Sequence, residues 1–388
     1  MHLLSYGGLR QWRVRVFFMY YINCNKKEMD KTKIIKEGFD FFFWEYESQT
    51  KIKHFIFEEY FDKWVKILGQ RNTLNYFDCY AGSGAYTEND QIHFGSPIRA
   101  AEIIEKNRDR LNRQVNIVLI EQDKANIDNI KKIFEYKKLK TIPIVINGDF
   151  DKTINDILDS HQGILSPTFF FIDPFGFTIK YETLKRIMSI PKSEILMNFM
   201  FTQINRFLID NLETTLNELF GCEDWKLLRN KTGYEREQSI VGLFRSQLKK
   251  LAQHVFYYRM SFPEKDRTYY YLFHLTSHPL GCSVMKSAFA KFNYGKVEYM
   301  GPKHRNQTLF DLTEIQTNEI KKYLLSIYKG KIKTYDDIIK EIIDEVPYLE
   351  GKIRNTIKDL ENKGIVKVKR VDSKTVRGLQ GKDIVSFL

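Results

Sequence analysis

Two segments of the sequence place chemically useful residues directly after an apolar run that is typical of a buried strand. The first, YFDCYAGSG over residues 76–84, runs into glycines, which let the backbone turn tightly and let a ligand approach closely. The second, FFFIDPFGF over residues 169–177, ends in an acid, a proline and aromatic residues. A carboxylate beside a backbone carbonyl can accept hydrogen bonds from a planar amine. The two segments therefore predict a ligand site and a reaction site at neighbouring strand ends.

The glycine-rich segment differs from the common nucleotide-binding fingerprints. Thr87 occupies the place of the third glycine in G-x-G-x-x-G, and no G-K-[ST] follows. The next strand-end acid, Glu121, comes 37 positions after Gly84, whereas a dinucleotide fold places it about twenty positions on. The spacing therefore disfavours a dinucleotide site and a P-loop. The candidate ligand-binding residues of this segment are Asp78, Ala81, Gly82, Ser83 and Gly84.

Two later strand ends carry further acids. Glu121 in VLIEQD is predicted to accept hydrogen bonds from two ribose hydroxyls, with Asp123 as its substitute and a solvated loop carboxylate as the alternative. Asp149 in VINGDF is predicted to lie near an adenine amino group, and capping of the next helix is an equal alternative. Ser96 as N-cap and Pro97 in the first turn predict a late helix start, so residues 85–95 are expected to form an insert over the pocket mouth.

The DPFG motif supplies the candidate catalytic residues. Asp173 and the carbonyl of Pro174 are predicted to orient an amine, and Phe175 or Phe177 to stack on a base. A structural turn is the alternative, because Asp, Pro and Gly are ordinary turn residues.

Three basic residues outside these motifs are candidates for the rim of the site. Lys53 and His54 lie in a predicted amphipathic helix before the first strand, where either could contact the cofactor or the substrate. A solvated lysine and a packed histidine are the alternatives. Arg206, after the fifth strand, is a candidate for a phosphate contact.

The elements that must position these residues alternate along the chain. From Asn75 onward, short β-rich runs alternate with helical stretches, which predicts a parallel sheet covered on both faces. Residues 194–200 add a fifth strand, 202–253 are rich in helical patterns, and 254–262 with 268–278 predict a closing hairpin. The predicted fold is therefore α/β, a Rossmann-like sheet of seven strands.

The C-terminal text has a different pattern. Three short helical patterns precede two β runs around a tip rich in Gly, Lys and Arg, which is the order of a winged helix-turn-helix. Residues 351–388 contain ten Lys or Arg against four Asp or Glu, a net +6 of the chain's +12. This charge indicates nucleic-acid contact, and a protein-docking module or a solvated face is the alternative. The candidate contacts are Lys352, Arg354, Lys367, Lys369 and Arg370.

Length and composition set the remaining limits. With 388 residues, 43% hydrophobic and 14% aromatic, the chain can bury a full core and is not a disordered or collagenous sequence. No segment approaches the ~20 apolar residues of a membrane helix. The four separated cysteines predict neither a disulfide framework nor a structural zinc site, which fits a soluble, cytoplasmic protein.

Three segments follow from these patterns. Residues 1–28 are expected to be an unstructured extension or the product of a misassigned start, because helical text follows Met29. Residues 29–305 form the α/β domain with its helical insertion at about 202–253, and residues 306–388 form the winged-helix domain.

The ordered motifs resemble those of class I S-adenosylmethionine-dependent methyltransferases. DCYAGSG is similar to their first motif, IEQD to the acidic second, NGDF to the third, and DPFG to the D-P-P-[YFW] signature of amino-methyltransferases. Here Phe175 replaces the second proline and Gly176 the aromatic residue. KHFIFEEYFDKW, GSPIRAAEII, MNFMFTQINRF and HLTSHPLGCSVMKSAF further resemble the bacterial three-Cys-motif partner family, TcmP, over nearly the whole chain from about residue 45.

These resemblances imply a function. They imply S-adenosylmethionine as cofactor, an exocyclic amine of a DNA or RNA base as target, and a three-Cys-motif radical-type protein as partner. The alternative is a catalytically inactive adaptor that keeps the methyltransferase fold and recruits that partner to nucleic acid. An NAD-dependent enzyme is the weakest alternative, because the glycine and acid spacings are wrong for it.

Overall fold

The computed structural model describes residues 31–208, 212–261, 267–291, 309–371 and 378–388, with the backbone alone over 309–316. The predicted extension at 1–28 and the predicted domain boundary at 305 lie outside the described residues. Within the described ranges, no helix combines the length and the apolar character needed to cross a membrane.

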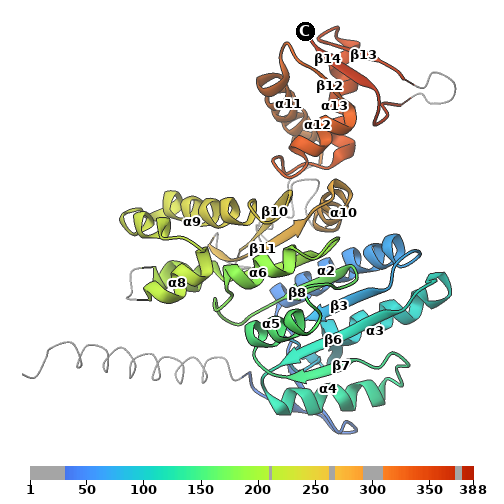
Figure 1. Cartoon of the computed structure of the whole chain (residues 1–388), viewed down its shortest axis with the longest axis vertical. Helices are drawn as coiled ribbons and strands as arrows, with labels where there is room; N and C mark the ends of the chain where they lie inside the picture. Colours follow the sequence, from blue (N-terminus) through green and yellow to red (C-terminus); the bar gives the residue numbers. More distant parts are fainter. Residues whose placement is uncertain (1–30, 209–211, 262–266, 292–308, 372–377) are drawn as a thin grey trace, which may run out of the picture.

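A mixed seven-stranded sheet forms the centre of the large domain (Figure 1). Its strands lie in the order β10-β11-β9-β8-β3-β6-β7. β11 pairs antiparallel with both β10 and β9, and all the other neighbouring strands pair in parallel. The predicted Rossmann-like sheet of seven strands is therefore confirmed as a large, mostly parallel sheet. Its strands are β3 (Leu74–Asp78), β6 (Val115–Glu121), β7 (Ile144–Asn147), β8 (Thr168–Ile172), β9 (Glu194–Phe199), β10 (His254–Ser261) and β11 (Thr268–Thr276).

The continuous apolar run of β8 serves two cores, one on each face of the sheet. Because successive strand side chains point to opposite faces, Phe169 and Phe171 enter one core while Phe170 and Ile172 enter the other. The first core is covered by α2 (Ser48–Leu68), α3 (Ser96–Asn107), α4 (Lys124–Tyr136) and α10 (Pro279–Ala290). The second is covered by α5 (Phe150–Ser160), α6 (Tyr181–Met188) and the helices that follow β9.

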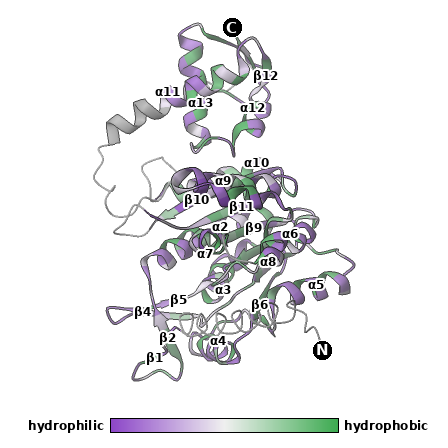
Figure 2. Cartoon of the chain, turned by 90° about the vertical axis from the view of Figure 1, so that its left-hand side faces the viewer, coloured by the Kyte–Doolittle hydropathy of each residue, from purple (hydrophilic) through white to green (hydrophobic). Residues whose placement is uncertain are grey.

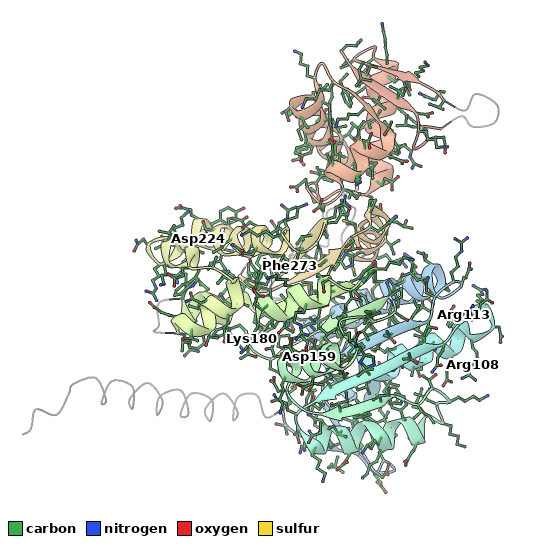
Figure 3. The ribbon with its side chains drawn as sticks, viewed as in Figure 1. Arg108, Arg113, Asp159, Lys180, Asp224 and Phe273 are labelled. Carbon is green, nitrogen blue, oxygen red and sulfur yellow. The ribbon has the colours of Figure 1, made fainter. Side chains whose placement is uncertain are left out.

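Different residues lie at the two ends of the parallel strands. Figure 3 shows Arg108, in the short 3₁₀ helix η1 (Arg108–Arg110), and Arg113 at the edge where β6 begins. The motifs that follow the strands lie at the opposite, carboxyl end of β3, β6 and β8. Loops at that carboxyl edge form the ligand crevice of open α/β sheets, so the fold brings the sequence-predicted residues to one side.

The predicted cap of α3 is wrong by one residue. Gly95, with extended backbone, is the N-cap, and Ser96 is the first helical residue, followed by Pro97. The shift places the Ser96 hydroxyl beside the cavity described below rather than on the helix's own backbone.

The helical pattern expected after Met29 is also wrong over residues 31–47. This stretch forms β1 (Ile34–Ile35) and β2 (Phe42–Glu45), and helix begins only at α2. Aromatic residues favour strands, and β2 pairs with the hairpin of β4 (Ala85–Glu88) and β5 (Gln91–Phe94). The insert at 85–95 is therefore half of a four-stranded sheet. Figure 2 shows this small sheet at the end of the molecule away from the C-terminal unit.

The stretch predicted at about 202–253 to be a helical insertion contains four helical elements: α7 (Phe201–Phe207), α8 (Glu213–Phe220), the 3₁₀ helix η2 (Asp224–Asn230) and α9 (Gly233–Leu248). Buried Trp225 and Phe244 join these helices to the second core. The hairpin of β10 and β11 follows as predicted, and most of its turn, 262–266, lies outside the described residues.

The C-terminal unit combines three helices with a small antiparallel sheet. Its elements are α11 (Leu309–Tyr328), β12 (Ile332–Thr334), α12 (Tyr335–Ile342), α13 (Glu350–Asn362), β13 (Val366–Lys369) and β14 (Ile384–Phe387). The strands lie in the order β12-β14-β13, and most of the tip between β13 and β14, 372–377, lies outside the described residues.

Two buried charged groups attach this unit to α9, β10 and α10 of the large domain (Figure 1). The Lys286 ammonium donates to the carbonyls of Ile343 and Val346, at 2.8 and 2.7 Å, and burial lowers its pKa to about 8. Burial alone would raise the pKa of Asp344, but hydrogen bonds from His254, Lys249 and a backbone N–H hold it well below its usual range. These contacts fix the unit against the hairpin edge of the sheet.

Candidate active site

A cavity of about 340 Å³ opens at the carboxyl ends of β3, β8 and β9. The chain crosses over there, since β3 lies between β8 and β6, and such a reversal of strand order is the usual ligand position of an open α/β sheet. Its lining joins α2, the glycine loop, the DPFG segment and the small sheet, and includes Lys31, Trp44, Lys53, His54, Tyr80, Ala81, Gly82, Tyr86, Ser96, Asp173, Pro174, Phe175, Asn198 and Met200.

The two glycines of the loop have different roles. Both have left-handed backbone, with φ of +64° at Gly82 and +77° at Gly84. A Cβ on Gly82 would lie 3.1 Å from the Trp44 ring at the cavity, whereas one on Gly84 would lie 3.1 Å from Ile130 on α4. Gly82 therefore borders the cavity, and Gly84 permits close packing of loop and helix.

Two other loop residues divide in the same way. Ala81 lines the cavity, while Ser83 is fully buried and its hydroxyl donates to the Ala85 carbonyl at 3.0 Å. Ser83 therefore shapes the loop, and its side chain does not reach the cavity.

Glu121 holds the glycine loop from the end of β6. Its Oε2 accepts from the backbone N–H of Gly82 and its Oε1 from that of Asp123, both at 2.8 Å. Each carboxylate oxygen keeps a second lone pair for another donor. Glu121 therefore fixes the loop through Gly82, which lines the cavity, although Glu121 itself does not line it.

The two neighbouring acids are helix caps. Asp123 accepts from the N–H of Ala125 at 2.8 Å and begins α4, and Asp149 accepts from the N–H of Lys152 at 3.0 Å and begins α5. The second oxygen of Asp149 accepts from Gln122 at 3.0 Å. Neither acid lines the cavity. The capping alternative therefore accounts for the contacts of Asp149.

Asp78, at the end of β3, is a buried carboxyl group with incomplete hydrogen bonding. Its Oδ2 accepts from the Tyr76 hydroxyl at 2.9 Å, and Oδ1 has no partner among the described residues. Burial raises the pKa of Asp78 to about 7, although the Ser96 and Tyr76 hydroxyls oppose the rise. The group therefore changes charge near neutral pH, and it is fully buried and does not line the cavity.

Asp173 is the centre of the polar contacts in the cavity. Its Oδ2 forms an ion pair with the Lys53 ammonium, and its Oδ1 accepts from the Asn198 amide at 2.9 Å. Lys53 is only 6% exposed, so the predicted solvated lysine is excluded. The arrangement presents a fixed carboxylate beside the Pro174 carbonyl.

The two aromatic residues at the end of the segment FFFIDPFGF lie in different environments. Phe175 lines the cavity, 38% exposed, with its ring edge-to-face against Trp44 at 5.8 Å. Phe177 stacks on Phe207 at 5.5 Å and packs against the second core instead. Of the two, Phe175 alone is available to a ligand in the cavity.

His54 fits the packed-histidine alternative while still bordering the cavity. Its Nδ1 lies 3.0 Å from the Tyr46 hydroxyl, and the two rings stack. Burial lowers the pKa of His54 well below its usual range, so the ring is neutral at pH 7. A neutral imidazole cannot provide a positive charge for a carboxylate ligand.

The remaining sequence candidates lie away from the cavity. Arg206 is exposed on α7 and does not line it. In the C-terminal unit, Arg354 is paired with Glu350 at 2.7 Å and Arg370 with Glu361 at 2.8 Å. Lys367 and Lys369 are exposed on one face of β13, and Lys352 is half-buried on α13.

Most of the cavity residues outside the glycine loop and the DPFG motif were missed in the sequence, among them Lys31, Trp44, Tyr86 and Asn198. Trp44 and Tyr86 come from the small sheet, whose pairing joins distant segments. Asn198 was readable as the single amide in the apolar strand EILMNF, and it contacts Asp173. The described residues contain no group of three His, Cys, Asp or Glu placed to hold a metal ion.

Comparison with known proteins identifies no family for the chain. No family model matches it, and no curated protein matches it. The TcmP resemblance therefore stays a prediction.

Similar solved structures include a SAM-dependent methyltransferase from Agrobacterium tumefaciens, at 12% identity and TM-score 0.38, covering 64% of this chain and 70% of that one. An O-methyltransferase from Bacillus cereus in complex with SAH has 12% identity and TM-score 0.34, covering 56% and 80%. Protein LPL1258 from Legionella pneumophila has 11% identity and TM-score 0.37, covering 63% and 92%.

Proposed function

We propose that the chain is an S-adenosylmethionine-dependent methyltransferase acting on an exocyclic amine of a nucleic-acid base. The observation that carries the proposal is one cavity that joins Ala81 and Gly82 of the glycine loop to Asp173 and Pro174 of the DPFG motif. A cofactor on the loop would meet its substrate at the motif.

The residues around the loop fit such a cofactor. Gly82 leaves open the space that a Cβ would fill beside Trp44, and Asp78 keeps a buried oxygen without a partner among the described residues. Glu121 keeps lone pairs for two ribose hydroxyls while it holds the Gly82 N–H. These residues would bind the cofactor, whereas Asp149 would support its neighbour Gln122.

The chemistry asked of the protein is mainly alignment. The sulfonium of the bound cofactor supplies an activated methyl group. Asp173 and the Pro174 carbonyl would accept the amine hydrogens and aim the nitrogen lone pair, and Phe175 would hold the base plane. Lys53 and Asn198 fix the Asp173 carboxylate before the substrate arrives.

The C-terminal unit supports a nucleic-acid substrate. We propose that it is a winged helix, because β12, α12 and α13 are followed by the hairpin of β13 and β14, which pairs with β12 in one three-stranded antiparallel sheet. Lys367 and Lys369 are exposed on β13, in a segment with a net charge of +6. Such charges bind phosphates and make the affinity dependent on salt.

A methyl-transfer assay tests the proposal. The full chain is incubated with labelled S-adenosylmethionine and separate DNA and RNA pools, and wild type is compared with Asp173→Asn. We expect label in one nucleic-acid pool, a loss of at least about 100-fold in the variant, and cofactor affinity within about threefold of wild type. An equal loss of transfer and cofactor affinity would contradict the role of Asp173.

One observation favours a second candidate, the non-catalytic adaptor. Lys53 already neutralises Asp173, and the ammonium of Lys31 stands in the same cavity. An adaptor of this kind would bind the cofactor and recruit a three-Cys-motif radical-type partner, as the TcmP resemblance implies. Cofactor binding without methyl transfer to any nucleic acid, together with co-purification of that partner, would select this candidate.

A further inference from the structure

The mouth of the cavity contains an aromatic box that holds a lysine of the same chain. The ammonium nitrogen of Lys31 lies 5.3 Å from the ring centroid of Trp44, 5.6 Å from that of Phe175 and 5.9 Å from that of Tyr86. Ammonium groups are attracted to the faces of aromatic rings within about 6 Å. The box is therefore a site for an aliphatic amine.

The box adjoins both halves of the candidate active site. Trp44 covers Gly82 of the glycine loop, and Phe175 belongs to the DPFG motif that carries Asp173. The charges of Asp173 and Lys53 both act on the Lys31 ammonium. An amine in the box consequently lies between the proposed cofactor loop and the proposed acceptor motif.

Burial and the charge of Lys53 favour the neutral, nucleophilic form of this amine, whereas the attraction of its cation to the three rings opposes that form. Burial lowers the pKa of Lys31, and Lys53 lowers it further, against the opposing charges of Glu47, Asp173 and Glu45. Within the described part of the chain, Lys31 forms no ion pair with a carboxylate. Loss of its proton to solvent therefore breaks no salt bridge.

We propose that Lys31 occupies the acceptor position in cis and is methylated there by its own chain when no other amine is present. This inference rests on the proposed function. The lone pair of neutral Nζ attacks the sulfonium methyl carbon, the C–N bond forms as the C–S bond breaks, and the cofactor leaves as the neutral thioether. The product is a methylated ammonium that keeps its two remaining N–H protons, since the one proton released in the reaction leaves for solvent before the attack.

The test uses the full chain with S-adenosylmethionine and no nucleic acid, followed by peptide mass spectrometry. Lys33 is an internal control, because its ammonium lies 5.0 Å from the Phe42 ring but outside the cavity. We expect methyl groups on Lys31 and none on Lys33, with a fraction modified that does not change on dilution of the protein. Equal modification of both lysines, or a yield that falls on dilution, would overturn the proposal.

Two variants separate the box from general effects. Phe175→Leu, at a partly exposed position, should reduce Lys31 methylation by about fivefold, because one of the three rings that hold the cation is removed. Lys31→Ala should abolish the modified peptide and raise transfer to nucleic acid, since the acceptor position is then open. An unchanged yield in Phe175→Leu would overturn the role of the box.

Binding of S-adenosylmethionine, measured in parallel by calorimetry, distinguishes a failure of this inference from a failure of the proposed function. If the cofactor binds and nucleic acid is methylated while Lys31 stays unmodified, the inference is wrong and the proposed function stands. If the cofactor does not bind, both are wrong.

Discussion

Lys53 of α2 forms an ion pair with Asp173 at the end of β8, across the cavity that joins the glycine loop to the DPFG motif. The lysine side chain is 8% exposed and the aspartate 20%. Both side chains are therefore mostly buried. Removing either one would leave the other as an unpaired buried charge, which is costly. A substitution of either residue should therefore affect both the stability of the fold and the proposed acceptor site.

Removing the cation of this pair should destabilise the protein. Lys53→Met is expected to lower the free energy of unfolding by about 2 kcal/mol, reduced from the fully buried case because Asp173 is partly exposed. Lys51→Met is the matched control, two residues away on the same helix, where the pair with Glu88 is about one-third exposed. That change should cost at most about 0.5 kcal/mol in urea unfolding. Equal effects would contradict the special position of Lys53.

The two loop glycines should respond differently to the same substitution. Gly82→Ala and Gly84→Ala both force a left-handed residue, at roughly 1–2 kcal/mol each. Gly82→Ala should additionally weaken S-adenosylmethionine binding by about tenfold, because its methyl group enters the space beside Trp44. Gly84→Ala should act mainly on stability, through Ile130. Calorimetry and urea unfolding on both variants measure the contrast, and a reversed order would refute the assignment of the two glycines.

Asp78 should make stability depend on pH. Its folded pKa of about 7 lies above the unfolded value, so its contribution is fully present below about pH 4 and is lost as the pH rises through 7. Asp78→Asn should therefore gain stability relative to wild type, by up to about 4 kcal/mol between pH 4 and 8. Urea unfolding at several pH values measures this difference. A difference that stays constant with pH would show that the carboxyl group does not titrate in this range.

Nucleic-acid binding should depend on Lys367 and Lys369 of β13, which form no ion pair with any described residue, more than on the paired arginines. Replacing both Lys367 and Lys369 by Ala should reduce the slope of log affinity against log salt by roughly 0.9 for each phosphate that is no longer neutralised. Arg354→Ala should change this slope less, because that guanidinium is already paired with Glu350. Filter binding at several salt concentrations distinguishes the two. A larger effect of Arg354→Ala would place the nucleic acid on α13 instead.

The sequence predicted the sheet and its strand ends because those depend on local patterns. The apolar run over residues 169–172 could only be a strand buried on both faces, and Asp173 follows it directly. The roles of Glu121 and Asp149 were harder to separate, since both follow strands and only the geometry shows that one holds the Gly82 N–H while the other caps a helix.

Local sequence patterns could not predict the aromatic residues of the site. Trp44 and Tyr86 meet because β2 pairs with β4, and no periodicity within either segment indicates that pairing. The helical interpretation of residues 31–47 failed for the same reason, since pairing with a distant hairpin decided the structure. Lys31 could not be placed without that small sheet.

The most direct test of the central claim is calorimetric titration of the full chain with S-adenosylmethionine, on wild type, Glu121→Gln and Asp123→Asn. The two variants remove the same charge two residues apart, but Glu121 holds the Gly82 N–H whereas Asp123 caps α4, a role that Asn keeps. We predict micromolar binding, on the order of −8 kcal/mol, weakened by at least about tenfold in Glu121→Gln and unchanged in Asp123→Asn. No binding by folded wild type, or equal weakening in both variants, would contradict the proposed cofactor site.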